Sequence, residues 1–497
     1  MSIATATNLD FKPARPLWMP FLSAVACVAL ADWLFYGWDV GISLALFLGV
    51  LGVVAVAGHR PGVTPPVQLL MGAAFVIGLL ALVENVSALS VFIGGLATAL
   101  FVIVITGREA SSWQRDLVEA MTIPFRGPFQ MAGDLIRTLR HTKLTPDWQG
   151  SLVAWIVPLS VFAVFAALFT SANPLIENRL SRVHLDDLFG SIDVQRSLFW
   201  LFIICVIWPL IRRRPRRAPS PRTATEAAAP TGNDYLLGVQ AMSRSLILFN
   251  ALFAVQTGLD LAYLWGGFSL PDGMSHAEYA HRGAYPLMMT ALLAAGFVLV
   301  AMRPGGPAEN SRLIRPLVLL WIAQNILLVV SSIFRLDLYV AAFSLTYLRL
   351  AALIWMALVA TGLVLILVQI KLNRSNAWLL SANAIALTVT LYACCFVNAP
   401  WLVASYNVQH CREINGTGPN LDLQYLESLG PQAEPALRPY LAEMPALSSM
   451  IYRWRSLNNH SNQSGNWRAW SFRAWRLQRY LANNPSTLPS PENDNKG

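Results

Sequence analysis

Residues 17–37 read LWMPFLSAVACVALADWLFYG, residues 378–397 read WLLSANAIALTVTLYACCFV, and apolar runs of this length occur about eleven times between Leu17 and Val397. Runs of about 20 mostly apolar residues match the hydrocarbon thickness of a bilayer. Inside that layer a helix satisfies its backbone hydrogen bonds within its own segment. The sequence therefore predicts an all-α, polytopic helical membrane protein of about 11 transmembrane helices, with a small helical C-terminal extramembrane domain.

The predicted spans cover most of the chain before residue 398. They lie at residues 17–36, 40–57, 67–83, 88–106, 151–170, 197–211, 246–266, 284–302, 316–334, 348–370 and 377–397. The span at 197–211 is short and contains Pro209, so totals of ten or twelve also fit the pattern. Composition agrees with this class, because 55% of the 497 residues are hydrophobic and only 13% are charged. Soluble proteins have about a quarter of their residues charged.

The positive charges lie mainly in the connections between spans. Six arginines occur within residues 212–222 (RRRPRRAPSPR), directly after a span. This position is typical of topology signals and of contacts with anionic lipid, rather than of nucleic-acid binding. If the N-terminus is cytoplasmic, the cytoplasmic connections carry 21 basic residues and the opposite ones carry 5. Because basic residues favour the cytoplasmic side, we expect a cytoplasmic N-terminus and an extracytoplasmic tail.

Four regions follow from this topology. They are an N-terminal transmembrane bundle at 1–211, a basic Pro/Ala-rich cytoplasmic linker at 212–245, a C-terminal transmembrane bundle at 246–397 and an extracytoplasmic helical tail at 398–497. The first bundle includes a cytoplasmic amphipathic segment, residues 107–150, with two prolines and a glycine in its middle. We expect two short helices there, lying on the membrane surface around a break.

The tail is predicted to contain a small helical core. Its apolar pattern consists of Tyr406, Leu421, Leu423, Tyr425, Leu426, Leu429 and Leu437. Burying about seven such side chains contributes roughly 10–20 kcal/mol before entropy, and ordering the segment removes most of that contribution. We therefore expect the tail to dock on the outer loops, with a helix carrying Trp467, Trp470 and Trp475 sealing the contact.

No sequence pattern specifies a reaction or a cofactor. Four of the five cysteines lie within apolar runs and none forms a CxxC pair, so neither disulfides nor a metal–thiolate site is implied. His276 and His281 flank Glu278, but residues five apart point about 140° away from each other on a helix. The chain has no HExxH, GxSxG or phosphate-binding glycine loop. We expect no catalytic, cofactor-binding or metal-binding residues, and enzyme activity is disfavoured.

Ionisable residues at membrane depth are costly, so each is a functional candidate. The candidate polar cluster comes from residues 275–287 (SHAEYAHRGAYPL) and 334–356, both expected on the outer side. Its members are Glu278, Tyr279, Arg282, Arg335, Asp337, Tyr339, Thr346 and Arg349. An arginine there can bind a carboxylate or phosphate, or it can hold a neighbouring acid in a structural pair. Asp260, the acid deepest in a span, is a weaker candidate for which an interhelical hydrogen bond is favoured over a proton or ion site.

Three motifs in order resemble the bacterial membrane family DUF4173, which is related to DUF4153. They are EYAHRGAYPL from Glu278, RLDLYVAAFSLTYLRLAALIWM from Arg335 and ASYNVQHCREINGTGPNLDLQYLESLGPQAEPAL from Ala404. The likeness covers about residues 235–480, and the N-terminal half resembles the family only in hydropathy. The chain has Phe343 and Ser344 where that family tends to have Tyr-Gly, and Gln432 where it tends to have Asp. The resemblance implies a bacterial inner-membrane protein and supplies no activity, since the family's function is undefined.

Three functions fit these features. The first is a sensor, scaffold or accessory protein whose outward-facing polar cluster and tail bind a partner or ligand. The second is a transporter or channel-like protein, which the many spans favour and the lack of clear internal repeats disfavours. The third is a membrane enzyme that acts on lipid-linked substrates at the outer face. Expected partners are the lipid bilayer, anionic lipid at the basic cytoplasmic segments and a protein at the C-terminal tail, without nucleic acid.

Overall fold

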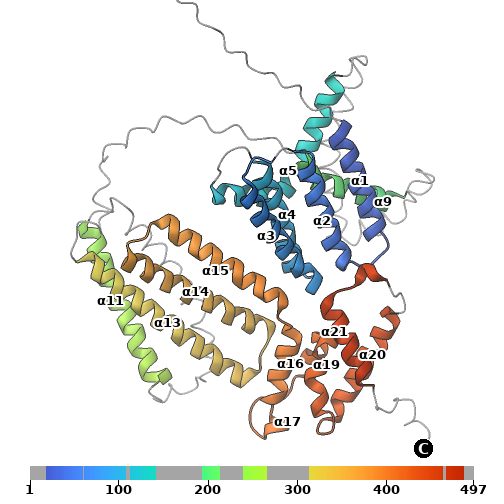
Figure 1. The fold of residues 1–497 in the computed structure, drawn as a ribbon. Coiled ribbons are helices and arrows are strands. Elements are labelled where there is room, and N and C mark those ends of the chain that lie inside the picture. Colours follow the sequence, from blue (N-terminus) through green and yellow to red (C-terminus); the bar gives the residue numbers. More distant parts are fainter. Residues whose placement is uncertain are drawn as a thin grey trace, which may run out of the picture. The chain divides into compact units, whose positions relative to one another are not determined.

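A computed structural model describes residues 18–59, 61–107, 112–141, 193–212, 239–265, 313–462 and 466–485, and within these ranges every regular element is a helix (Figure 1). The chain divides into two compact units. Unit 1 comprises residues 1–218 and 466–475, and unit 2 comprises residues 219–465 and 476–497. The predicted all-α class is therefore confirmed for the described part of the chain, and the four predicted regions stay a prediction.

Seven described helices are long and apolar enough to cross a membrane. They are α3 (Pro65–Glu84), α4 (Ala88–Thr106), α9 (Val194–Ile211), α11 (Val239–Leu259, with the apolar stretch at Ser243–Ala262), α13 (Ile314–Phe343), α14 (Tyr347–Leu372) and α15 (Asn376–Phe396). Two shorter apolar helices, α1 (Trp18–Phe35) and α2 (Ile42–Ala57), coincide with the first two predicted spans. The predicted spans at 151–170 and 284–302 lie outside the described residues. A multi-pass helical membrane protein is thus supported, whereas the total of about eleven spans stays a prediction.

The helices of unit 1 approach one another closely at small residues. A Cβ atom built on Gly52 of α2 would lie 2.7 Å from the ring of Phe75 on α3. A Cβ atom on Gly78 of α3 would lie 2.4 Å from the Cβ of Ala97 on α4. Such close approach is typical of helix association in membranes, where side-chain packing takes the place of the hydrophobic effect. Side chains that face outward are apolar as well, for example Leu69, which is 78% exposed.

The prediction of two short helices around a break in residues 107–150 is wrong. α5 is one continuous helix, Trp113–His141, and it includes both prolines. Its Gly127 lies against α9, where an added Cβ would be 1.8 Å from the carbonyl oxygen of Cys205. That carbonyl lacks the donor a helix normally supplies four residues later, because Pro209 has no N–H. Packing against α9 thus overrides the local break that the prolines of α5 favour.

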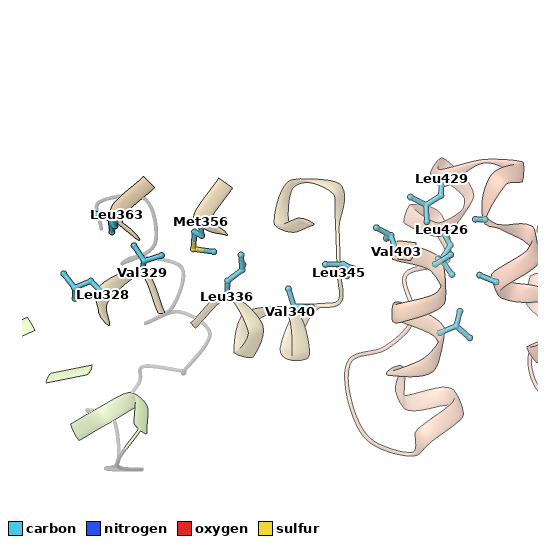
Figure 2. Packing of buried hydrophobic residues seen from close by; sticks show 14 of the residues in the cluster. Leu328, Val329, Leu336, Val340, Leu345, Met356, Leu363, Val403, Leu426 and Leu429 are labelled. Carbon is cyan, nitrogen blue, oxygen red and sulfur yellow. The ribbon is translucent and has the colours of Figure 1, made fainter. Parts of the chain in front are cut away.

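The spans of unit 2 share one buried cluster with the tail. The short connections at 344–346 and 373–375 make α13, α14 and α15 antiparallel neighbours. The cluster runs from Leu328, Val329, Leu336 and Val340 of α13 and Met356 and Leu363 of α14, through Leu345, to Val403, Leu426 and Leu429 of the tail (Figure 2). The tail is therefore built onto the ends of α13 and α14 through a common core.

The tail consists of short helices separated by turns. They are α16 (Ala399–Gln409), α17 (Arg412–Asn415), α18 (Leu423–Leu429), η2 (Pro431–Ala433), α19 (Glu434–Leu437), η3 (Arg438–Tyr440), α20 (Pro445–Asn462), η4 (Trp467–Ala469) and α21 (Phe472–Asn483). Of the predicted tail core, Leu426, Leu429 and Leu437 are buried, and Tyr406, Leu421 and Tyr425 pack against them. The inclusion of Leu423 was wrong, because its side chain is 39% exposed at the first position of α18.

Candidate functional site

A buried ion pair joins two helices of unit 2. Asp260 follows α11 and begins a π-helical turn, η1 (Asp260–Trp265). The Nη2 atom of Arg335 on α13 donates to Oδ1 of Asp260, and Nε2 of Gln256 donates to the same oxygen at 2.9 Å. Asp260 is fully buried and Arg335 is 2% exposed. Asp260 thus makes the interhelical hydrogen bond that the sequence favoured, and its partner is one of the candidate arginines.

The burial of this ion pair determines what its two charges cost and contribute in free energy. A single charge in the middle of a membrane helix costs about 2.5–3.5 kcal/mol on insertion scales. An acid and a base that neutralise each other reduce that cost, and removing either one from a buried pair costs about 3–5 kcal/mol. The Asp260–Arg335 pair therefore links the end of α11 to α13. Single π-turns within helices are often found at functional sites.

The turn between α13 and α14 gathers most of the other candidates. Thr346 caps α14, and its Oγ1 accepts from the backbone N–H of Arg349 at 3.4 Å. The Nη1 atom of Arg349 donates to the carbonyl oxygen of Phe343 at 2.5 Å and to that of Ser344. The guanidinium also lies 4.5 Å from the ring centre of Tyr339. The last carbonyl groups of a helix have no N–H partner within that helix. Arg349, at the start of α14, supplies the missing donors to the carbonyl groups at the end of α13.

Ser344 takes an unusual backbone conformation in this turn. Its φ of 68° and ψ of 166° lie in a region that is occupied essentially only by glycine. The resembled motif tends to have glycine at this position, and the sharp turn supplies the physical reason. Serine is therefore strained here, and the neighbouring hydrogen bonds of Arg349 hold the turn in place.

A buried asparagine of the tail forms hydrogen bonds with the same turn. Asn407 of α16 is 4% exposed. Its Oδ1 accepts from the backbone N–H of Leu345 at 2.6 Å, and its Nδ2 donates to the carbonyl oxygen of Leu345 at 2.9 Å. The N–H of Tyr347 donates to the hydroxyl of Tyr425 on α18 at 2.9 Å. Two tail helices thus hydrogen-bond to the backbone N–H and C=O of Leu345 and to the N–H of Tyr347, and we call these contacts the tail clamp.

The structure separates the predicted site residues into several groups. Asp260 and Arg335 form the ion pair, and Tyr339, Thr346 and Arg349 surround the turn. Asp337 is exposed on α13. Burial, together with the charge of Asp337, raises the pKa of Tyr406 on α16. Glu278, Tyr279 and Arg282 lie outside the described residues.

Sequence reasoning missed Asn407, and it placed Tyr425 only in the predicted tail core without a contact to this turn. Asn407 and Tyr425 both stand in the third motif that carries the family resemblance. They are separated from Leu345 and Tyr347 by 62 and 78 residues. Their place in a motif was the available signal, because an asparagine within an apolar helix has few structural uses other than a buried hydrogen bond.

Unit 1 has its own polar cluster, at the end of α1 and the start of α9. Asp32 accepts from Nε and Nη2 of Arg196 at 2.8 and 2.5 Å, and from Nε1 of Trp200 at 2.8 Å. Asp193 caps α9 and accepts from the hydroxyl of Tyr36 at 2.5 Å. This hydrogen bond, followed by that from the N–H of Arg196, lowers the pKa of Asp193. The cluster fastens the two helix ends together and resembles an interfacial anchor of aromatic and basic groups.

Tail residues 466–475 contact helix ends of unit 1. The N–H of Ile42 donates to the carbonyl oxygen of Trp470 at 2.7 Å. The guanidinium of Arg468 lies 4.6 Å from the ring centre of Trp33. Glu84 and Arg473 form a buried pair, with Oε1 and Nε 3.2 Å apart. The start of α2 and the ends of α1 and α3 therefore meet this tail segment, as expected if they lie on the same side of the membrane.

Among the described residues, no group of three or more His, Cys, Asp or Glu side chains could hold a metal ion. All five cysteines are free thiols. Several acids of the described part are paired with arginines, among them Asp32, Glu84, Asp134 and Asp260.

Comparison with known families places most of this chain in one of them. The family model described as "Domain of unknown function (DUF4153)" matches residues 67–440, well over half of the chain. This match begins at residue 67, ahead of residue 235, where the predicted resemblance to DUF4173 begins. The resemblance to DUF4173 itself stays a prediction. Neither the curated proteins nor the solved structures contain a match.

Proposed function

Because the chain belongs to the family described as "Domain of unknown function (DUF4153)", whose name assigns no activity, we propose its function from the geometry. The proposed function is that of an integral membrane accessory or scaffold protein whose tail presents a surface to a protein partner. The tail clamp carries this proposal: Asn407 makes two hydrogen bonds to the backbone of Leu345 from within the shared core. A partner bound to such a tail is held in a fixed position relative to α13 and α14.

The contacts of the two candidate arginines, Arg335 and Arg349, support the same function. Arg349 donates to the carbonyl oxygens of Phe343 and Ser344, and Arg335 donates to Asp260. These arginines perform structural tasks, and a scaffold requires no further chemistry from them. Exposed side chains of the tail, such as Tyr452 at 39%, are available for contact with a protein.

A transporter or channel-like protein is the second candidate. The observation that favours it is the buried Asp260–Arg335 pair beside a π-helical turn. In a transporter this pair would exchange partners as the helices move. A membrane enzyme acting on lipid-linked substrates stays the third alternative, with no described group of residues favouring it.

Two variants separate the first two candidates. The readout is the set of lipid and metabolite differences between a strain lacking the gene and its parent. The double variant Asp260→Leu/Arg335→Met removes both charges and leaves no unpaired partner, so a scaffold should restore the parental pattern and a transporter that uses the pair should not. Truncation after Val397 should fail to restore it if the tail carries the function. Full restoration by the truncated chain would overturn the proposal.

Photo-crosslinking identifies the surface directly. A crosslinking amino acid at Tyr452 of the tail should give one discrete protein adduct in cells. The same group at Ile385 of α15, which is 64% exposed on a span, is the control and should give lipid adducts only. Identical adduct patterns at both positions would count against a tail surface.

We also propose the location and orientation that the sequence predicts: a bacterial inner membrane, a cytoplasmic N-terminus, an extracytoplasmic tail and anionic lipid at the basic cytoplasmic segments. The contact of residues 466–475 with the ends of α1 and α3 supports a common side for these parts. A reporter that is active only outside the cytoplasm should work after Asn398 and fail at Ala224. Activity at Ala224 would reverse the orientation.

A further inference from the structure

α5 is the one long described helix of unit 1 that is too polar to span a membrane, and its outer face is entirely apolar. Within residues 118–129 six side chains are exposed, and none is charged or hydrogen-bonding. They are Val118, Met121, Pro124, Phe125, Pro128 and Phe129. Phe125 and Phe129 are 76% and 71% exposed, which is unusual for aromatic side chains in contact with water.

These side chains form one stripe. Val118, Met121, Phe125 and Phe129 follow one another at intervals of three, four and four residues, so they share a face of the helix. The opposite face, with Ala120, Ile123 and Gly127, is buried. α5 therefore has two apolar faces, one packed within unit 1 and one directed outward.

A row of arginines flanks the outward stripe. Arg115, Arg126 and Arg137 are eleven residues apart, close to three helical turns, so they lie along one line with a spacing of about 16 Å. Arg115 and Arg137 are exposed and Arg126 is half-buried. Glu119 shares this flank, which leaves the basic charges in excess.

The contacts of α5 place it next to the start of the polybasic run. Nε2 of Gln130 donates to the carbonyl oxygen of Arg212 at 2.8 Å, and Arg212 pairs with Asp134 at 2.8 Å. Nε1 of Trp208 also donates to Asp134, at 3.2 Å. Arg212 is the first of the six arginines in residues 212–222. α5 thus contacts the last turn of α9 and Arg212, which directly follows it.

We propose that the outer face of α5 is a docking surface for an anionic membrane leaflet. The stripe inserts between the acyl chains near the headgroups, and the arginine row contacts lipid phosphates, as in helices that lie in the membrane interface. The positive charge of the arginine row favours lipid over a protein as the occupant, because basic residues beside an apolar stripe complement a negative bilayer surface. The inference rests on the part of the proposed function that gives anionic lipid to the basic segments, and it names α5 as the site.

Hydrogen–deuterium exchange of the full chain in nanodiscs tests the surface. One disc contains phosphatidylcholine only, and the other contains about one part in three of phosphatidylglycerol. Because each arginine near an anionic surface contributes about a five-fold preference, peptides within residues 113–134 should exchange at least about ten-fold more slowly in the anionic disc. The same rate in both discs would overturn the proposal. Equally slow exchange in detergent would also overturn it and would indicate a protein segment as the occupant.

Two variants locate the effect. Arg115→Gln/Arg126→Gln/Arg137→Gln should abolish the difference between the two discs, and the control Arg412→Gln/Arg453→Gln/Arg479→Gln in the tail should keep it. A second variant, Phe125→Ser/Phe129→Ser, leaves the packed face of α5 intact and should accelerate exchange in the anionic disc. Unchanged exchange in this second variant would refute insertion of the stripe. Crosslinking at Tyr452 reports on the tail alone, so the proposed function and this inference can fail separately.

Discussion

Replacing Asn407 with leucine removes the tail clamp while keeping the side-chain volume nearly constant. In the native protein Asn407 satisfies both the N–H and the carbonyl group of Leu345, at 2.6 and 2.9 Å. Leu345 is 6% exposed, so water cannot replace the lost amide. Leaving two buried polar groups without partners costs about 1–3 kcal/mol each, or roughly 2–6 kcal/mol in all. In a unit of this size that corresponds to a fall in Tm of roughly 5–20 °C.

The assay is thermal unfolding of the purified chain in detergent or nanodiscs, with two further variants beside Asn407→Leu. Asn407→Asp keeps the oxygen that accepts from Leu345, but it places a carboxylate oxygen against the carbonyl oxygen of Leu345. Because a buried charge without a partner is costly, this variant should be destabilised at least as much as Asn407→Leu. Asn420→Leu changes the same residue type at an exposed tail position and should stay within about 0.5 kcal/mol of the native protein. A Tm for Asn407→Leu within one degree of the native value, or an equal loss in the control, would refute the reasoning.

Three further predictions follow from backbone geometry and burial. Ser344→Gly should stabilise the protein by about 1 kcal/mol, because the strain of this φ and ψ exceeds the entropy cost of glycine; Asn373→Gly, at a φ of 48° that asparagine tolerates, should change Tm little. Gly127→Ala should destabilise unit 1 by about 3 kcal/mol or more, since its Cβ would meet the carbonyl of Cys205, whereas Gly133→Ala has open space and should stabilise slightly. Burial raises the pKa of Cys411, so the folded thiol stays neutral where the unfolded thiol ionises. Stability should therefore be constant below about pH 8.5 and fall above it, and Cys411→Ala should flatten this dependence in unfolding curves measured from pH 7 to pH 10.

The spans could be predicted from sequence because hydrophobicity over about 20 residues is a local property. The continuity of α5 could not, since it depends on contact between Gly127 and Cys205, two residues far apart in the chain. The pairing of Asp260 with Arg335 could not be predicted either, because the sequence does not show which of several acids an arginine binds. The local hydropathy pattern predicts where the helices lie, whereas contacts between distant residues determine which helices and side chains pair.

Ser344 and the tail clamp show what a motif can and cannot provide. The resemblance marked the positions of Ser344, Asn407 and Tyr425, yet it gave no reason for any of them. The reason appears only when the tail lies against residues 345–347. A positive φ at a non-glycine residue also has no signature in a single sequence, because it depends on how two helices meet.

The central feature of unit 2 is that α16, α18 and α19 of the tail belong to the same folded core as α13 and α14. Hydrogen–deuterium exchange of the full-length protein measures this directly, through peptides from residues 343–349, α16 and α18. If the claim holds, all three regions exchange together, at least about a thousand-fold more slowly than an unstructured chain, and Asn407→Leu accelerates all of them. Tail helices that exchange at nearly unstructured rates while α13 and α14 stay protected would contradict it.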